Sequence, residues 1–279
     1  MSYIMKSPTI LLVDNGSRRA ASTLQLRQLA LQLEKVSGQT IYPVSLQHAD
    51  HIDVEELDRI SANTLEPFLR GQLQAGQREF LVLPLFFGKS RALTSFIPET
   101  INRLAEEFGS FELRQADELC PLPGGEPLLA QILYDNIMTV MESHALSGAR
   151  VVLVDHGSPI PEVTAVREWL AGSLQQLLGP QITFHEAVME RRAGSKYDFN
   201  GRLLEELLPE LVSSTAKEAI VLSMLFLSPG RHAGAGGDIE TIRDELLHEH
   251  PQACCYITPL VGEHPTIIEI LRQRLEKAL

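Results

Sequence analysis

Two histidines and one glutamate follow three apolar segments in the second half of the chain. His156 follows residues 151–154, Glu190 follows residues 181–189, and His232 lies in the glycine-rich loop after residues 219–227. Neutral imidazoles bind divalent ions such as Co²⁺, Fe²⁺ or Ni²⁺, and a carboxylate beside them can ligate the ion or accept protons. These residue types predict a catalytic site in which His156 and His232 are the metal ligands and Glu190 handles protons.

The segments around these residues alternate between two kinds. Short apolar runs, typical of strands covered on both faces of a sheet, occupy residues 151–154, 181–189, 219–227 and 253–258. Longer segments with apolar residues at three- and four-residue spacing, which predicts helices, occupy residues 162–178, 199–212, 239–248 and 266–278. Ser158 and Asp238 stand where helix N-caps are expected. The alternation predicts a doubly wound parallel sheet, with ligands at the carboxyl ends of its strands.

The chain contains this unit twice. Residues 10–17 (ILLVDNGS) match residues 151–158 (VVLVDHGS), and three later pairs of segments match in the same order. Those pairs are 82–87 with 221–227, 96–100 with 238–241, and 121–127 with 259–265. We therefore expect an α/β protein made of two tandem, duplicated, doubly wound parallel-sheet domains, residues 1–146 and 147–279.

The first copy serves as an internal control for the candidate site. The residues aligned with His156, Glu190 and His232 are Asn15, Gln47 and Ala92. Asn and Gln keep approximate side-chain shapes but lose the imidazole lone pair or the charge. All three chemical groups are missing together, although the neighbouring Gly-Ser and Gly-Glu-Pro patterns are kept. This covariation predicts one chemical site, in residues 147–279, and a degenerate counterpart in residues 1–146.

The combined motifs resemble a known family over nearly the whole chain. The motifs are His156-Gly-Ser, Glu190 after the second strand, Gly230-Arg-His232, Asp238-Ile239 and Gly262-Glu-His-Pro265. Together they resemble the sirohydrochlorin chelatases of the long, two-domain CbiX/SirB kind. The better-known two-domain members keep the histidines in the first half, and the loop between His232 and Asp238 is longer here.

This resemblance implies a chelatase-like fold and a metal-insertion activity. Such enzymes insert Co²⁺ or Fe²⁺ into sirohydrochlorin without ATP, on the way to cobalamin or sirohaem. The metal is then a substrate, and no organic cofactor is expected. The family's two histidines and glutamate correspond by motif to His156, His232 and Glu190.

The net charge of the chain restricts the kinds of partner that it is expected to bind. The 24 Lys and Arg residues against 36 Asp and Glu residues give a formal charge of -12, which disfavours nucleic acid as a partner. A polycarboxylate tetrapyrrole nevertheless needs local donors, and basic residues cluster in sequence near the candidate site. We expect substrate contacts from Ser158, Arg191, Arg192 and Arg231, with Lys196 beside them.

The remaining expectations concern compartment and assembly. No apolar run approaches the ~18 residues that a transmembrane helix needs, so a cytoplasmic protein without a membrane partner is expected. Cys120, Cys254 and Cys255 form no C-x-x-C pair and are interpreted as reduced core residues. We expect a monomer, because the duplication supplies within one chain the pairing that a one-domain relative obtains by dimerising.

Two other functions stay open from the sequence. A metal or tetrapyrrole carrier would bind the ion and the ring without joining them. The loss of the candidate site from the first copy favours this function. Another α/β enzyme could use His156 with Glu190 or Asp155 as an acid–base pair on a small anion.

Overall fold

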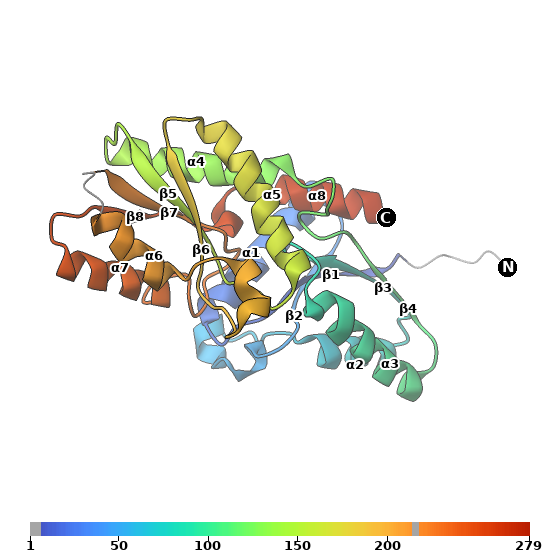
Figure 1. Ribbon diagram of the computed structural model, residues 1–279. Coiled ribbons are helices and arrows are strands. Elements are labelled where there is room, and N and C mark those ends of the chain that lie inside the picture. The colour runs from blue at the N-terminus through green and yellow to red at the C-terminus, as the bar shows by residue number, and fades with distance from the viewer. Residues whose placement is uncertain (1–6, 214–217) are drawn as a thin grey trace. The chain divides into compact units, whose positions relative to one another are not determined.

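The computed structural model describes residues 7–213 and 218–279, and these form two compact units. The first unit contains the chain up to Pro121 together with Ile268–Leu279, and the second contains Leu122–Ile267. Figure 1 shows both units as sheets with helices packed on them. Within the described ranges, no helix combines the length and the apolar character needed to cross a bilayer.

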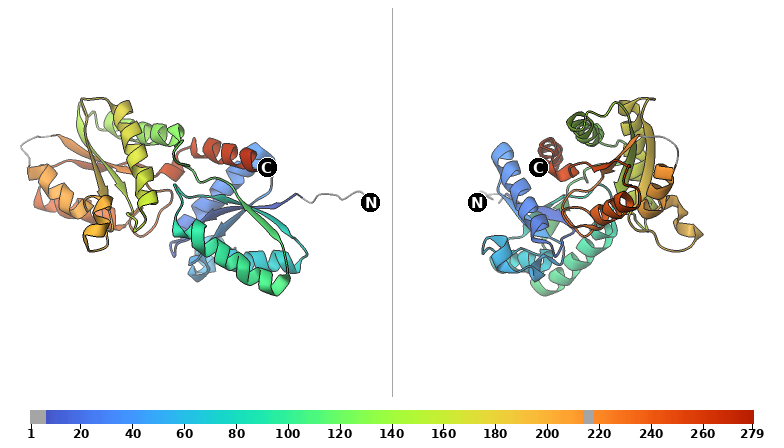
Figure 2. Two further views of the ribbon diagram at one scale, coloured as in Figure 1. Left: turned by 45° about the vertical axis from the view of Figure 1, so that its right-hand side comes forward. Right: turned by 90° about the vertical axis from the view of Figure 1, so that its left-hand side faces the viewer.

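The first unit is built on a four-stranded parallel sheet in the order β2-β1-β3-β4. Its strands are β1 (Thr9–Asp14), β2 (Ile41–Ser45), β3 (Glu79–Pro84) and β4 (Glu112–Gln115). Its helices are α1 (Ala20–Ser37), α2 (Leu65–Gln74), α3 (Ile97–Phe108) and α8 (Ile267–Ala278), with a π-helix at Ala92–Phe96 directly before α3. In Figure 2, α2 and α3 lie on one face of this sheet, and α1 and α8 lie on the other.

The second unit repeats this topology with a parallel sheet in the order β6-β5-β7-β8. Its strands are β5 (Ala149–Asp155), β6 (Thr183–Val188), β7 (Ala219–Met224) and β8 (Cys255–Ile257). Its helices are α4 (Pro127–Ser143), α5 (Pro161–Leu178), α6 (Leu204–Ser213) and α7 (Asp238–Glu249), with a 3₁₀ helix at Ser195–Asn200. Figure 1 shows α4 and α5 on one face of the sheet and α6 and α7 on the other.

Burial on both faces explains why the strands are continuously apolar. In β5, Val152 and Val154 pack with α6 and α7, in a cluster that includes Leu208 and Ile239. Residues in between, such as Leu153, are equally buried but point to the opposite face, because side chains alternate along a strand. This two-sided burial fixes the strand ends, and therefore the residues that follow them.

The fold class expected from the sequence is confirmed: each unit is a doubly wound parallel sheet. The starts of three helices differ from expectation. Helix α6 begins at Leu204 rather than at residue 199, because the apolar residue Phe199 belongs to the preceding 3₁₀ helix. Asp238 is the first residue of α7 and Ile160 is the N-cap of α5, so neither Asp238 nor Ser158 is an N-cap residue. Cys254 is exposed, which corrects its assignment to the core, whereas Cys120 and Cys255 are buried.

The compact units do not coincide with the two sequence repeats. Helix α4 ends the first repeat in sequence but belongs to the second unit, and nearly all of α8, the last helix of the second repeat, belongs to the first unit. In the second unit, α4 packs along α5 and β7. In the first unit, Arg274 of α8 donates to the carbonyl oxygens of Glu118 and Leu119 at 3.0 Å. Each unit therefore receives one helix from the other repeat.

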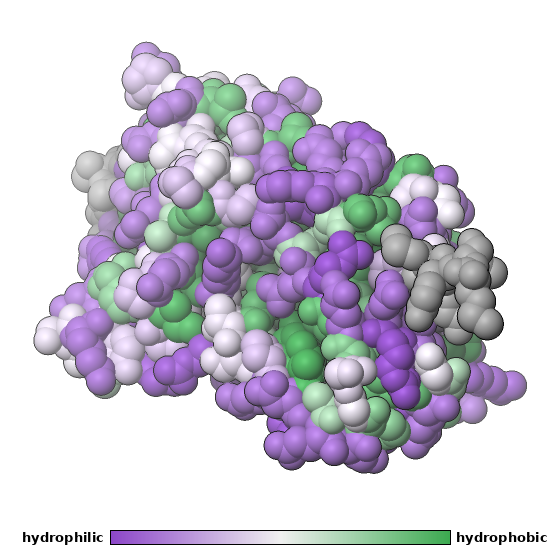
Figure 3. Space-filling model, turned by 90° about the vertical axis from the view of Figure 1, so that its right-hand side faces the viewer, coloured by the Kyte–Doolittle hydropathy of each residue, from purple (hydrophilic) through white to green (hydrophobic). Residues whose placement is uncertain are grey.

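Hydrophilic side chains surround smaller groups of hydrophobic ones on the surface drawn in Figure 3. Among the described residues, five of the seven exposed large hydrophobic side chains lie between residues 31 and 60, including Ile60 at 63 % and Val36 at 54 %, and they are spread over α1, β2 and the segment after β2. Scattered apolar side chains of this kind are ordinary on a water-exposed surface.

Candidate metal centre

His156 directly follows β5, and the turn that carries it is held against the turn after β6. The main-chain N–H of Glu190 donates to the carbonyl oxygen of His156 at 2.9 Å. Gly157 has φ +85°, and a Cβ atom at this position would collide with the carbonyl oxygen of Glu190. Only a glycine fits this close approach at positive φ. The glycine thus brings the His156 and Glu190 backbones together.

His232 reaches the same place from the loop after β7. Because β5 and β7 are neighbours at the point where the strand order reverses, this position is the switch point at which doubly wound sheets bind ligands. The rings of His156 and His232 have centroids 4.7 Å apart and planes inclined by 75°. One ligand atom each from His156, Glu190 and His232 lie within 4.8 Å of one another. The three residues singled out by sequence therefore meet at one edge of the second unit.

Asp238 orients the ring of His232. Its Oδ2 lies 2.8 Å from His232 Nδ1, and only 6 % of the His232 surface is exposed. An ionised carboxylate can only accept, so Nδ1 donates. In this tautomer the lone pair of Nε2 faces Glu190 Oε1, 3.1 Å away, so two acceptors meet with no hydrogen between them, and a cation can bridge such a pair. A carboxylate behind one imidazole nitrogen, with the other turned to the site, is the usual arrangement around a metal-binding histidine.

Arg231 lies between the two carboxylates that contact His232. Its guanidinium is 3.4 Å from Glu190 Oε1 and 3.3 Å from Asp238 Oδ2, although 76 % of its side chain is exposed. Arg231 is therefore paired within the protein. A cavity of about 250 Å³ opens beside Glu190 and His232 and extends to Glu205 and Thr241. Through this cavity, solvent and ligands can reach the side of the site that carries the Glu190 carboxylate.

The other predicted substrate contacts gather on the loop that follows Glu190. Arg191 donates to the carbonyl oxygen of Gly201 at 2.8 Å. Arg192 and Lys196 both lie over the ring of Tyr197, at 5.8 Å and 5.0 Å from its centroid. The two cations and the ring form an exposed basic cluster with an aromatic centre, in which Tyr197 was not predicted from the sequence.

Ser158 is held by the protein itself. Its main-chain N–H donates to Asn200 Oδ1 at 2.9 Å, and its Oγ accepts from the N–H of Ile160 at 3.1 Å. The main-chain N–H that was expected to meet a substrate anion is already paired, whereas the hydroxyl hydrogen of Ser158 stays available as a donor.

A buried polar network beneath His156 was also not predicted. Arg167 of α5 contacts Asp155 and Glu186, and its Nη2 donates to the carbonyl oxygen of Asn200. Burial raises the pKa of the Asp155 carboxyl, and the adjacent Arg167 guanidinium opposes that rise. A signal existed in the sequence, because Arg167 falls within the apolar stripe of its helix, between Val166 and Leu170. Its partners are too distant in sequence for the spacing of residues to pair them.

The first unit has the same strand ends with different chemistry. Asn15, Gln47 and Ala92 line a cavity of about 250 Å³ together with Arg91 and Glu99. The strand-end glycine is kept as Gly16, at φ +82°, in the same close approach to the carbonyl oxygen of Gln47. The first unit thus keeps the scaffold of the site and lacks its imidazoles.

Comparison with known proteins assigns the chain to a family. The family model CbiX matches twice, over residues 9–140 and 150–278, so the chain belongs to the CbiX family. This confirms the resemblance to sirohydrochlorin chelatases inferred from the motifs. No curated protein matches the chain.

Three solved structures share the fold of this chain. SirB from Bacillus subtilis with Fe³⁺ has a TM-score of 0.69 and 18% identity, covering 98% of this chain and 96% of that one. SirB from Bacillus subtilis subspecies spizizenii in complex with cobalt has a TM-score of 0.66 and 18% identity, covering 98% and 95%. CbiX, the terminal enzyme for biosynthesis of siroheme in denitrifying bacteria, has a TM-score of 0.56 and 16% identity, covering 98% and 100%. At these identities the likeness describes the fold.

Proposed function

We propose that this protein is an ATP-independent sirohydrochlorin chelatase that inserts Co²⁺ or Fe²⁺ into the ring, in cobalamin or sirohaem biosynthesis. The observation that carries the proposal is the meeting of His156, Glu190 and His232 within 4.8 Å at the switch point of the second unit. Family membership supports it, and so do the Fe³⁺ and cobalt bound by two proteins of the same fold. The metal ion is a substrate, for which Ni²⁺ is a further candidate.

The proposed reaction exchanges one divalent ion for two protons. His156 and His232 hold the ion through imidazole nitrogens, and this small ligand set leaves coordination positions open for the ring nitrogens. As the ion enters the ring, the two pyrrole N–H groups lose their protons. Glu190 accepts these protons and passes them to solvent, since its side chain is exposed at the mouth of the cavity.

Basic residues near the site would bind the carboxylates of the tetrapyrrole. Arg191 and Arg192 lie on the loop after Glu190, and Lys196 lies in the 3₁₀ helix that follows. Ser158 is bonded through its main-chain N–H to Asn200, the last residue of that 3₁₀ helix. Arg231 contributes by exchanging Glu190 for a substrate carboxylate, which also frees Glu190 to take a proton. Rising salt should weaken ring binding, because exposed ion pairs are screened.

The absence of both imidazoles and the carboxylate from the first repeat favours one alternative. This alternative is a carrier that binds the metal and the ring but does not join them. An acid–base enzyme that pairs His156 with Asp155 has less support, because Asp155 Oδ1 is already shared by Arg167 and the N–H of Gly157. The chelatase proposal also includes a cytoplasmic monomer, since the duplication provides two units within one chain.

One experiment separates the chelatase from the carrier. Metal-free sirohydrochlorin and Co²⁺ are mixed with the purified protein, and the visible spectrum of the ring is followed against a control without protein. A chelatase accelerates the change to the metallated spectrum at catalytic protein concentration. A carrier shifts the spectra of its bound ligands in proportion to its own concentration and leaves the insertion rate at the level of the control.

A further inference from the structure

Asn200 ties down the main chain directly after His156. Its side chain is 1 % exposed and bonds both sides of Ser158: Oδ1 accepts from the Ser158 N–H at 2.9 Å, and Nδ2 donates to the Ser158 carbonyl oxygen at 2.7 Å. Asp155 Oδ1 accepts from the N–H of Gly157 at 3.0 Å. Two consecutive peptide groups after His156 are therefore fixed by buried side chains.

One of these peptide groups also contacts the His156 ring. The Gly157 carbonyl oxygen lies 3.1 Å from His156 Nδ1, and the N–H of the same peptide group, that of Ser158, donates to Asn200. A carbonyl oxygen can only accept, so Nδ1 carries the hydrogen and Nε2 keeps its lone pair. Asn200 thus sets the direction of the peptide group that selects the metal-binding tautomer of His156.

Arg167 holds Asn200 in place from beneath. Its side chain is 3 % exposed, and its Nη2 donates to the Asn200 carbonyl oxygen at 2.9 Å. The same guanidinium is 3.1 Å from Asp155 Oδ1 and 2.9 Å from Glu186 Oε2, which compensates its buried charge. One buried cation therefore connects α5, β5, β6 and the 3₁₀ helix that ends at Asn200.

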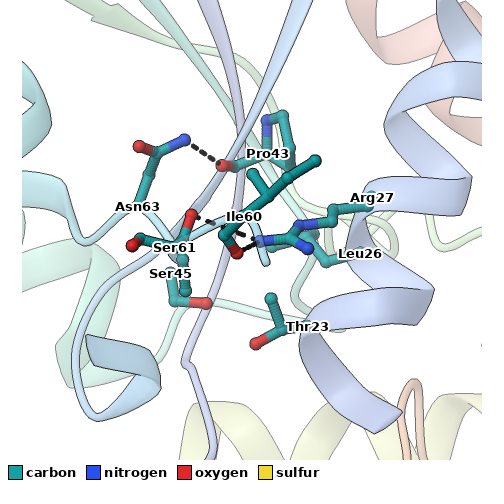
Figure 4. Close-up of a pocket in the computed structure, with 9 residues that line it drawn as sticks. Thr23, Leu26, Arg27, Pro43, Ser45, Ile60, Ser61 and Asn63 are labelled. Atoms are coloured by element: carbon teal, nitrogen blue, oxygen red, sulfur yellow. Dashed lines mark hydrogen bonds between the residues drawn. The ribbon is translucent and has the colours of Figure 1, made fainter. Parts of the chain in front are cut away.

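In the first repeat the side chains of this network are replaced, although Arg27 Nη2 donates to the Ser61 carbonyl oxygen at 3.2 Å, as Arg167 does to that of Asn200. Strand registers and bridges align Arg167, Glu186 and Asn200 with Leu26, Pro43 and Ser61. A cavity of about 220 Å³ lies there, lined by Leu26, Pro43 and Ser61. Figure 4 shows Thr23 at its side and Arg27 bonded to the main chain of Ile60 and Ser61. Among the described residues, the buried Thr23 hydroxyl has no hydrogen-bond partner, whereas the aligned Thr164 hydroxyl donates to Asn200.

The turn itself does not require the network. Gly16 has φ +82° and Gly157 has φ +85°, and both make the same close approach to the neighbouring strand-end carbonyl. The Asn200 and Arg167 side chains are thus absent from the repeat that has no histidines at the aligned strand-end positions, while the backbone of the turn is preserved. This pattern associates the network with the ligand rather than with the fold of the turn.

We propose that Asn200 is a positioning residue for His156 and acts through the Gly157–Ser158 peptide, with Arg167 holding Asn200. The inference rests on the proposed metal site and adds residues that determine its affinity. Fixing the ring before the ion arrives reduces the ordering required on binding. Loss of the network should lower metal affinity more than it lowers the stability of the fold.

The test compares two buried substitutions in the full chain. Asn200→Ser introduces the residue found in the first repeat and removes both bonds to Ser158. Thr164→Val is the matched control, because it removes one buried hydrogen bond to Asn200 and leaves Ser158 bound. Co²⁺ titration, followed through the visible absorption of the bound ion, gives the dissociation constant and the ligand-field spectrum. Thermal denaturation reports folding, and ¹⁵N NMR reports the His156 tautomer.

We expect Asn200→Ser to raise the Co²⁺ dissociation constant about tenfold, with a changed spectrum and a mixed His156 tautomer. Thr164→Val should keep the wild-type constant, spectrum and tautomer. Asn200→Asp keeps the acceptor for the Ser158 N–H but loses the donor to the Ser158 carbonyl oxygen, so it should raise the constant by a smaller factor than Asn200→Ser, and it tests the inference if Asn200→Ser does not fold. Wild-type Co²⁺ affinity in both Asn200 variants overturns the inference alone. Absence of Co²⁺ binding by the unsubstituted protein overturns the proposed function and the inference with it.

Discussion

Two aligned aspartates show how single residues separate the repeats. Asp155 shares its buried carboxylate with Arg167, whereas the aligned Asp14 has Leu26 where Arg167 would stand. Asp14 is 7 % exposed, and burial raises its pKa from 3.8 to about 6, against the opposing hydrogen bonds of Ser45 and Gly16. The first repeat has kept an acid whose cationic partner is gone.

The first prediction concerns the free energy of unfolding. Because the folded-state pKa of Asp14 lies above the unfolded value, ionisation favours the unfolded chain, and stability falls as pH rises from about 4 to about 6. Asp14→Asn should therefore stabilise the first unit by about 1–3 kcal/mol above pH 6, and the gain should vanish below pH 4. Urea denaturation at pH 4, 5, 6 and 7.5 measures it. Asp155→Asn is the contrast and should destabilise at pH 7.5, since it leaves Arg167 undercompensated. A gain independent of pH would contradict the raised pKa.

The second prediction contrasts aligned residues of the two strand-end sites. His156→Ala and His232→Ala each remove one of very few ligands and should lower the initial insertion rate at least tenfold. Asn15→Ala and Gln47→Ala should stay within about twofold, because neutral amides neither compete with imidazole for Co²⁺ nor accept ring protons near neutral pH. The measurement is the initial insertion rate of all four variants at the same metal and sirohydrochlorin concentrations, with circular dichroism as the folding control. Equal losses at all four positions would require both units for the reaction.

At the scale of elements, the function depends on how turns and strand ends meet. The turn after β5 crosses the turn after β6 so closely that a glycine is required, and this crossing brings His156 next to Glu190. The first unit has the same crossing between the turns after β1 and β2. Both repeats therefore contain the same crossing of two turns. Only in the second repeat does this crossing bring imidazoles and a carboxylate together.

The third prediction uses the two glycines as a matched pair. An alanine at either position adopts a strained positive φ and pushes the crossing turns apart, which costs roughly 1–3 kcal/mol of stability. Gly157→Ala should in addition raise the Co²⁺ dissociation constant at least tenfold, because His156 and Glu190 separate. Gly16→Ala should lose stability to a similar degree and keep wild-type Co²⁺ affinity. Thermal denaturation and Co²⁺ titration of both variants provide the measurements. Equal affinity losses would show that general destabilisation governs the site.

The strand ends were predictable because each buried strand is a continuous apolar run, and parallel order follows from alternation with helices. These two patterns are enough to place His156, Glu190 and His232 at one edge of a sheet. The contact of Asp238 with His232 was not predicted, because an aspartate before a helix is normally a cap. The pairing of Arg167 with Asn200 joins residues 33 positions apart. Hydrophobic periodicity carries no information on such a polar contact.

At the scale of the whole molecule, duplication has been followed by exchange of the last helices. Sequence similarity defines the repeats, yet it cannot tell which sheet each terminal helix covers, since both α4 and α8 carry apolar residues at helical spacing. Helix α4 buries Leu129, Ile132, Leu133 and Ile137 within the second unit. Burial of each such side chain contributes roughly 1.5–3 kcal/mol. The sum is comparable with the whole stability of a domain, about 5–15 kcal/mol.

The last prediction follows from this exchange and compares two fragments. Residues 122–267 form a compact unit that contains α4 and the complete His156, Glu190 and His232 set. Residues 149–279, which begin at the first residue of β5 in the second repeat, lack α4 and leave uncovered the part of one sheet face that α4 shares with α5. The first fragment should fold cooperatively and bind Co²⁺, and the second should aggregate or unfold at least several kcal/mol more easily. Circular dichroism, urea denaturation and Co²⁺ titration of both fragments give the comparison. If residues 149–279 fold and bind equally well, α8 has taken the place of α4, and the two helices are interchangeable covers for the same sheet.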